Sequence, residues 1–288
     1  MKVTDLQLAM EPALIKKLDL MTKRCEQQKP EWDSLLLVEG GEGDGKTTCG
    51  ANCGYYIHHE TGRPFGNQNI FFDVGSMIKF AQNTTKQIIM WDEPALEGLS
   101  AEWWRQTQRD LIKLLMMCRK NRHFFIFNIT RFNKFSEYIV VDRAMGMIHV
   151  YSRRQMEPGR FVYIRKKYLE YLYNDYRTSK RRNYKKYASI RGTFPDALHK
   201  IIDMKEYNER KDKAIMSIGT KKESLEKNKL NNLQKRIGLI KFPIKTQTEF
   251  AGKLHIDRKT LSNWGRKEGK VPDKGDTPSF EAGKGSNI

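Results

Sequence analysis

The chain has 288 residues, of which 39% are hydrophobic, and a formal net charge of +19; this length allows one sizeable core, or a core with a small appendage. The sequence has no run of about 18 apolar residues and no apolar N-terminal stretch with a cleavage site, so we expect neither a membrane span nor a signal peptide. The cysteines lack CxxC spacing, which favours free thiols in the cytoplasm over a zinc site; they are Cys25, Cys49, Cys53 and Cys118.

Apolar runs and helical patterns alternate along the first half of the chain. Four runs are typical of buried strands: residues 35–38, 69–74, 86–94 and 123–130. Helical patterns lie between them, at residues 47–59, 74–82 and, with Ser100 as a cap, 100–121. Two alternating runs predict a hairpin, at 146–152 and 160–165. This order predicts an α/β fold with a mostly parallel central sheet that is covered on both faces.

The loop after the first strand carries a phosphate-binding pattern. Its letters "GGEGDGKT" fit G-x-x-x-x-G-K-[ST]. Glycines let backbone N–H groups turn inward around a phosphate, and the following helix adds its positive N-terminus. We predict that Lys46 reaches the β- and γ-phosphates and that Thr47 ligates Mg²⁺, while the acidic side chains of Glu42 and Asp44 point outward. The predicted nucleotide-binding residues are Gly40, Gly41, Gly43, Asp44, Gly45, Lys46, Thr47 and Thr48. The alternative is a glycine-rich loop beside a charged helix start.

An acidic pair follows the third predicted strand, in "IIMWDE". The carboxyl end of a strand is where such sheets bind ligands. We predict that Asp92 holds Mg²⁺ through water and that Glu93 activates the attacking water; a solvated turn before Pro94 is the alternative. The fourth strand ends in Asn128 and Thr130. The order of these motifs resembles the P-loop ATPases, and the resemblance implies that a polar residue here senses the γ-phosphate or places water; a buried capping role is the alternative.

A multimeric ATPase also needs an arginine from a neighbouring subunit. Arg131, just beyond the fourth strand, is our preferred candidate among the four available, which are Arg119, Arg122, Arg131 and Arg143.

One strand lies between the glycine loop and the acidic pair, and a glutamate follows the aspartate. This order resembles the additional-strand P-loop ATPases, which include RecA, AAA+ and FtsK/HerA-like enzymes. Residues 30–165 look like FtsK/HerA-like DNA-pumping ATPases, including Zot-type and phage motors. The resemblance implies Mg²⁺-dependent ATP hydrolysis in a homo-oligomer, in the form of a ring. No N-K-x-D motif is present, so ATP is favoured over GTP.

Positive charge is concentrated in the second half. Residues 1–150 hold 19 Lys/Arg and 18 Asp/Glu, whereas residues 151–288 hold 34 and 16. This asymmetry favours a nucleic-acid partner over a solvated lysine-rich surface. Within residues 177–191 the predicted contacts are Arg177, Lys180, Arg181, Arg182, Lys185 and Lys186, and the interleaved Tyr184 and Tyr187 can stack on unpaired bases. The alternative is a solvated helix face with both tyrosines turned inward.

Residues 246–264 resemble a helix-turn-helix of the phage and transposon type. The resemblance implies that Arg258, Lys259, Thr260 and Asn263 face duplex DNA. A helical hairpin for protein contact is the alternative.

These patterns together predict four regions: a P-loop ATPase domain at 1–165, a basic helical region at 166–238, a helix-turn-helix at 239–270 and a disordered tail at 271–288. The predicted function is an ATP-driven DNA motor of a virus or mobile element, acting in genome packaging or DNA transfer in the host cytoplasm. An AAA+-like helicase loader or initiator that uses ATP as a switch, and a nucleotide-controlled DNA-binding regulator, are the alternatives.

Overall fold

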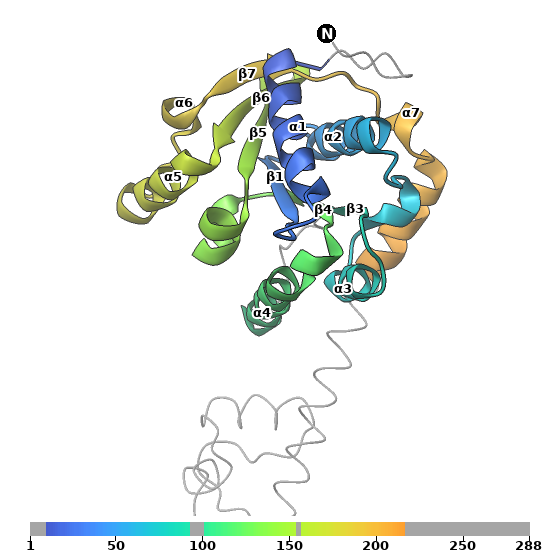
Figure 1. Cartoon of the computed structure of the whole chain (residues 1–288). Helices are drawn as coiled ribbons and strands as arrows, with labels where there is room; N and C mark the ends of the chain where they lie inside the picture. The colour runs from blue at the N-terminus through green and yellow to red at the C-terminus, as the bar shows by residue number, and fades with distance from the viewer. Residues whose placement is uncertain (1–9, 93–100, 154–156, 217–288) are drawn as a thin grey trace, which may run out of the picture. The chain divides into compact units, whose positions relative to one another are not determined.

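The computed structural model describes residues 10–92, 101–153 and 157–216 (Figure 1). The chain divides into Met1–Ile218 and Gly219–Ile288, and only the first unit contains described residues. Several predictions therefore lie outside the described residues: the role of Glu93, the region 217–238, the helix-turn-helix with Arg258, Lys259, Thr260 and Asn263, and the tail.

A seven-stranded sheet forms the centre of the first unit, in the order β2-β3-β4-β1-β5-β6-β7. The strands β2, β3, β4, β1 and β5 pair in parallel, whereas β5–β6 and β6–β7 are antiparallel. Their bounds are β1 Ser34–Gly40, β2 Ile70–Phe71, β3 Ile88–Asp92, β4 Phe124–Ile129, β5 Gly146–Arg153, β6 Glu157–Arg165 and β7 Ile190–Thr193. The predicted α/β fold with a mostly parallel sheet, and the predicted hairpin β5–β6, are confirmed.

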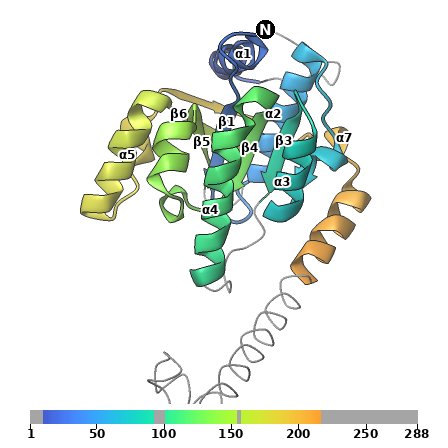
Figure 2. The same cartoon turned by 60° about the horizontal axis from the view of Figure 1, so that its bottom comes forward.

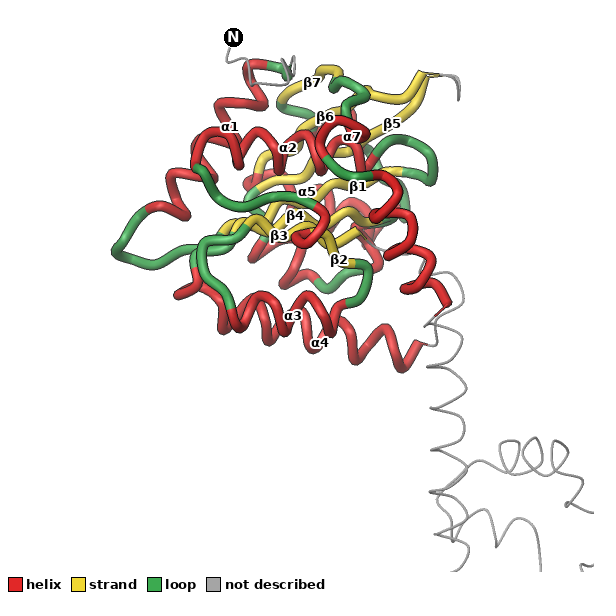
Figure 3. The backbone as a smooth tube through the Cα atoms, turned by 90° about the vertical axis from the view of Figure 1, so that its right-hand side faces the viewer, coloured by secondary structure: helices red, strands yellow, loops and turns green. Residues whose placement is uncertain are grey.

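Helices cover both faces of this sheet, as Figure 3 shows edge-on. One face carries α1 (Pro12–Glu26) and α2 (Lys46–Thr61). The other carries α3 (Val74–Asn83), α4 (Ala101–Met117) and α5 (Lys166–Ser179), and Figure 2 shows α3 and α4 side by side in front of the strands. Short helical segments connect them: η1 Asn67–Asn69, η2 Cys118–Asn121, η3 Phe132–Lys134, the π-helix η4 Tyr138–Arg143, α6 Tyr184–Tyr187 and α7 Leu198–Ile201. A further helix spans residues 204–216.

The two layers explain why β1 is apolar without alternation. Leu36 and Val38 pack in the core under α1 and α2, whereas Leu35 and Leu37 pack in the opposite core. A strand that is covered on both faces has no solvent side, so every position favours an apolar residue. The same holds for β3 and β4, whose residues are all buried.

Several elements differ from the prediction. The second strand is only Ile70–Phe71, because the Asp73 carboxylate accepts a hydrogen bond from the Ser76 N–H and starts α3 at Val74. The predicted helix 100–121 is α4 followed by the 3₁₀ turn η2. Strand β6 begins at Glu157, inside the predicted turn. The sequence reasoning did not predict α1.

The region after residue 165 is not only helical, because β7 adds a strand to the sheet within it. The predicted boundary between residues 165 and 166 falls inside the unit Met1–Ile218. Leu169 and Leu172 of α5 are fully buried in one core, and Phe194 and Tyr207 belong to the other. The described part of the basic region is therefore built into the α/β unit.

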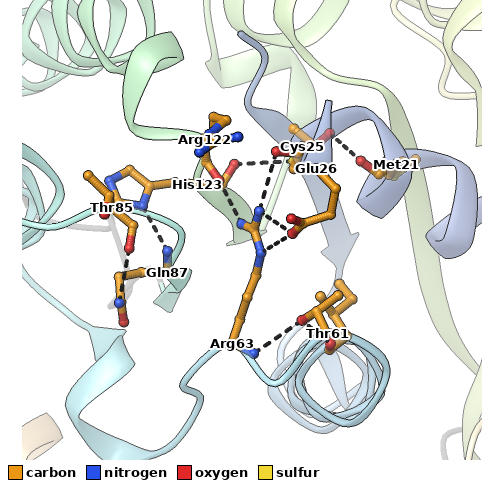
Figure 4. A network of polar contacts seen from close by, with 11 residues as sticks. Met21, Cys25, Glu26, Thr61, Arg63, Thr85, Gln87, Arg122 and His123 are labelled. Atoms are coloured by element: carbon orange, nitrogen blue, oxygen red, sulfur yellow. Dashed lines mark hydrogen bonds and ion pairs between the residues drawn. The ribbon is translucent and has the colours of Figure 1, made fainter. Parts of the chain in front are cut away.

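A polar network fixes the edge of the sheet at which β1, β3 and β4 begin (Figure 4). Arg63, only 4% exposed, donates hydrogen bonds to the Glu26 carboxylate and to the carbonyls of Cys25 and Arg122. His123 accepts from the Gln87 N–H at Nδ1, which leaves Nε2 to donate to the Ala81 carbonyl. These contacts join α1 and the end of α2 to the residues just before β3 and β4. They lie at the opposite end of the strands from the glycine loop.

The described helices include none that is long and apolar enough to pass through a bilayer. The four cysteines are buried free thiols.

Candidate functional site

The predicted site residues gather at the edge where β1, β3 and β4 end. Strand β4 lies between the other two, and Asn128 is in register with Val38 on one side and with Asp92 on the other. The glycine loop follows β1 directly and leads into α2. Parallel neighbours end at the same edge, which is how residues from three separate segments meet.

The loop conformation requires glycine at particular positions. Gly43 and Gly45 have φ of 77° and 91°, in the left-handed region that glycine adopts without strain. Gly45 directly precedes α2, and its carbonyl accepts the first helical hydrogen bond from the Cys49 N–H. At Gly40 a Cβ atom would lie 2.6 Å from the Val150 carbonyl oxygen of β5. The pattern that predicted a phosphate loop therefore has a backbone reason at each of these glycines.

Lys46 and Asp44 fold back on the loop itself. The Lys46 Nζ donates to the Gly41 carbonyl at 2.6 Å. The Asp44 carboxylate accepts from the Gly41 N–H at 2.8 Å, and its other oxygen accepts from the Ser152 N–H and hydroxyl at 3.1 and 2.6 Å. Glu42 is exposed, as expected. The expectation for Asp44 is wrong, because its side chain ties the loop to the end of β5 instead of pointing outward.

Asp92 lies across the mouth of the loop from Thr47. The Thr47 hydroxyl is 3.2 and 3.1 Å from the two Asp92 carboxylate oxygens, and the Asn128 amide donates to Asp92 at 3.0 Å. Asp92 is 5% exposed and Asn128 is 1% exposed. The Asn128 Oδ1 has no hydrogen-bond partner among the residues that the structure describes. A buried amide oxygen with no partner can accept a hydrogen bond from a bound water.

Gly50 of α2 makes room for Asn128. A Cβ atom at position 50 would lie 2.5 Å from the Asn128 Oδ1 and 3.2 Å from its Cγ and Nδ2. The packing of α2 on β4 at this point therefore depends on a residue without a side chain.

Tyr207 is a member of the site that the sequence reasoning missed. Its hydroxyl donates to the Asp92 carboxylate at 2.5 Å, from a position 115 residues along the chain. Burial raises the pKa of Tyr207, and the Asp92 charge raises it further, while a hydrogen bond with Thr47 lowers it. Its ring packs edge-on against Phe72. No local signal marks this tyrosine, because it belongs to a charged helix.

Glu39, the last side chain of β1 before the loop, is a second group that was missed. It is 1% exposed and accepts from Tyr184 at 2.6 Å, with the His149 Nδ1 at 2.5 Å. The His149 and Tyr184 rings stack with centroids 3.6 Å apart. Burial and Glu39 raise the pKa of the Tyr184 hydroxyl. In the sequence Glu39 resembles the polar end of an apolar strand, so only the fold reveals its partners.

The remaining predicted residues beyond β4, and the alternative arginine Arg143, differ in how exposed they are to solvent. Thr130 is half-buried just beyond β4, and Arg131 beside it is exposed. Arg143 is 8% exposed and donates two 2.6 Å hydrogen bonds to the buried Asp33. Of the candidate arginines for a neighbouring subunit, Arg143 is therefore committed to an internal ion pair, whereas Arg131 is accessible.

The basic segment 177–191 keeps its charged side chains at the surface and its tyrosines inside. Arg181 and Lys185 are exposed, as is Lys180 at the end of α5, and Arg182 lies 4.0 Å from Glu39. Two of the predicted contacts have internal ion pairs, Arg177 with Glu137 at 3.2 Å and Lys186 with Asp175 at 2.9 Å. Tyr184 and Tyr187 donate to Glu39 and Asp175. The inward-facing alternative holds for these two rings, so they do not form a base-stacking surface.

The candidate metal ligands are Thr47 and Asp92. Among the described residues no group of three His, Cys, Asp or Glu side chains could hold a metal ion. Mg²⁺ does not need such a group, because it keeps several waters and usually takes one or two protein oxygens together with phosphate oxygens. A hydroxyl and a carboxylate about 3 Å apart beside the glycine loop fit this ion.

No protein-family model matches the chain, and no curated protein matches it either.

Proposed function

We propose that the chain is a magnesium-dependent ATPase that moves or remodels DNA. The main support for the ATPase part is the contact between the Thr47 hydroxyl and the Asp92 carboxylate. This contact lies beside the glycine loop, in which two glycines adopt the left-handed conformation. A helix N-terminus and a lysine lie on the phosphate side of this meeting point, and a carboxylate lies on the metal side. This combination suits a triphosphate with its metal better than either a bare anion or a bare cation.

Each side chain has a role in this proposal. Lys46 exchanges the Gly41 carbonyl for phosphate oxygens, and Thr47 and Asp92 hold the metal directly and through water. Bound magnesium would neutralise charge on the phosphates. Asn128, whose amide donates to Asp92, helps to place the attacking water, and Glu93, the residue after Asp92, takes the proton from that water.

The strand order supports the additional-strand group within the P-loop ATPases. Strand β4 is inserted between the loop strand β1 and the acidic strand β3. The exposed Arg131 at the end of that inserted strand supports a role as the arginine given to a neighbour in a homo-oligomeric ring.

The DNA part of the proposal depends on charge. The second half of the chain has 34 Lys/Arg against 16 Asp/Glu, and exposed cations of residues 177–191 belong to it. Clustered cations gain affinity for phosphates by releasing counterions. Genome packaging or DNA transfer in a virus or mobile element is the process that this combination suits best.

The test is ATP turnover by the full chain, with and without duplex or single-stranded DNA. We expect Mg²⁺-dependent turnover that DNA stimulates, loss of turnover in Lys46→Ala and Glu93→Gln, and little change in Lys113→Ala, an exposed lysine of α4. Deleting residues 240–288 should remove most duplex affinity and leave basal turnover intact. Wild-type protein that neither retains nor hydrolyses ATP would refute the ATPase assignment.

The same measurement separates the alternatives. Sustained turnover with strand movement supports a motor. A single slow turnover per bound nucleotide would support the loader or initiator that uses ATP as a switch. Sequence-specific DNA binding that Glu93→Gln leaves unchanged, without turnover, would support the regulator.

A further inference from the structure

Several hydrogen bonds hold the helix at residues 204–216 beside the candidate site. The Asn67 amide donates to the Asp203 carbonyl at 2.9 Å and to the Glu206 carboxylate at 2.8 Å. Arg210 donates to the carbonyls of Asn67 and Ile70, the latter at 2.9 Å. These contacts join the helix to η1 and to the start of β2, and they bring Tyr207 to Asp92.

The position of the Tyr207 hydroxyl is specific. It donates to the Asp92 Oδ2, and the Thr47 hydroxyl also lies within hydrogen-bond reach of it. Thr47 and Asp92 are the two residues that would hold magnesium. The tyrosine hydroxyl therefore contacts both metal-binding groups and bonds the Asp92 oxygen that the ion or one of its waters would need.

A hydroxyl and a hydrated ion cannot both fill this place. Mg²⁺ binds oxygen ligands at about 2.0–2.1 Å and holds its coordination shell in a strict octahedron. Asp92 accepts hydrogen bonds from Thr47, Asn128 and Tyr207, so the Tyr207 contact leaves this carboxylate with less capacity to accept from an ion or its waters. Metal entry requires that Tyr207 leave.

We propose that Tyr207 is a gating residue whose hydroxyl takes the place of magnesium or of a water in its shell in the nucleotide-free protein, and that it is displaced when magnesium arrives with ATP. This inference rests on the proposed nucleotide site. Displacement loosens helix 204–216, which is the last described element before the residues that carry the predicted helix-turn-helix. Binding free energies that are coupled in this way act in both directions, so events in the C-terminal part also change the affinity for Mg²⁺ with ATP.

The test is the affinity of the full chain for a fluorescent, non-hydrolysable ATP analogue, measured with Mg²⁺ and again with EDTA. In Tyr207→Phe the ring and its contact with Phe72 remain, but the competing hydroxyl is gone. We expect the variant to bind the analogue about tenfold more tightly than wild type with Mg²⁺, because wild type gives up a hydrogen bond to a carboxylate, and equally in EDTA. Tyr173→Phe is the matched control, since its hydroxyl bonds the Phe135 carbonyl elsewhere.

A second measurement uses the wild-type protein alone. Amide hydrogen exchange in residues 204–216 should speed up when the analogue is added with Mg²⁺ but not with EDTA, while exchange in α5 stays constant. Equal or weaker Mg²⁺-dependent binding in a folded Tyr207→Phe, or unchanged exchange in 204–216, overturns the gating role and leaves the nucleotide site standing. Absence of analogue binding by wild type under both conditions overturns the nucleotide site and the gating role together.

Discussion

Replacing Gly50 with alanine tests the packing that positions Asn128 against Asp92. Gly50 lies inside α2, and an added Cβ atom would meet the Asn128 Oδ1 at 2.5 Å. A comfortable carbon–oxygen contact is about 3.3 Å or longer, so the amide must move by nearly 1 Å. Asn128 is buried and donates a 3.0 Å hydrogen bond to Asp92, so this movement weakens or breaks that bond.

The expected magnitude is the sum of three effects on the free energy of unfolding. Alanine gains about 1 kcal/mol over glycine within a helix. Overpacking a core costs about 1–3 kcal/mol, and losing a hydrogen bond to a charged group costs about 1.5–3 kcal/mol. The costs exceed the gain, so Gly50→Ala should destabilise the protein by about 1.5–5 kcal/mol. It should also lose ATP turnover if Asn128 places the attacking water.

Urea unfolding of four proteins isolates this effect: wild type, Gly50→Ala, Asn128→Ala and the double variant. In the double variant the clash is absent, so the cost of Gly50→Ala should fall by more than about 1 kcal/mol. Gly54→Ala is the matched control on the same helix, because its Cβ would meet the ring of Phe65, 2.5 Å away, and disturbs no polar contact of the site. Additive effects in the cycle, or a Gly50→Ala protein that is more stable than wild type, would refute the reasoning.

Two further predictions concern the opposite edge of the sheet. Arg143→Leu should lower the free energy of unfolding by about 3–5 kcal/mol in urea, because it leaves the buried Asp33 unpaired, whereas Arg177→Leu, which removes an exposed pair, should cost under about 1 kcal/mol. Burial lowers the pKa of His123 from 6.5. Just below pH 6.5 the histidine is therefore protonated in the unfolded chain but neutral in the folded one. The stability present above pH 6.5 should therefore fall as the pH drops below it, by up to about 1.4 kcal/mol per pH unit, and a pH series of unfolding midpoints should be flatter for His123→Gln.

The central strands could be predicted from the sequence because their signal is local. A strand with helices on both faces favours apolar residues without alternation, and β1, β3 and β4 each contain such a run before a polar residue near the carboxyl end. The glycine loop is also a local signal, since its left-handed residues must be glycine. The meeting of Thr47 with Asp92 followed from two local patterns, because both were expected at the carboxyl ends of parallel strands.

The missed residues depend on contacts between distant segments. Strand β7 pairs with the free edge of β6, and its four residues give too short a pattern to stand out in basic surroundings. Tyr207 reaches Asp92 only after β7 and α7 have led the chain back over the α2 side of the sheet. Asp44 turns inward because Ser152, 108 residues away, offers it two donors. The partners of these residues lie far away in the sequence, so no local pattern could identify them.

The contacts of the site in this state bear on which ligand it selects. The Gly41 N–H is bound to Asp44, Lys46 to the Gly41 carbonyl, and Thr47 to Asp92. A ligand must replace these hydrogen bonds. If it leaves a buried polar group without a partner, the free-energy cost exceeds the net contribution of the hydrogen bond that was lost. A bare phosphate can satisfy Lys46 but leaves Thr47 and Asp92 as they are, with Tyr207 still in place. A metal–triphosphate compensates both halves at once. In the proposed nucleotide site, these internal bonds would therefore lower the affinity for every anion and raise the preference for one that brings magnesium.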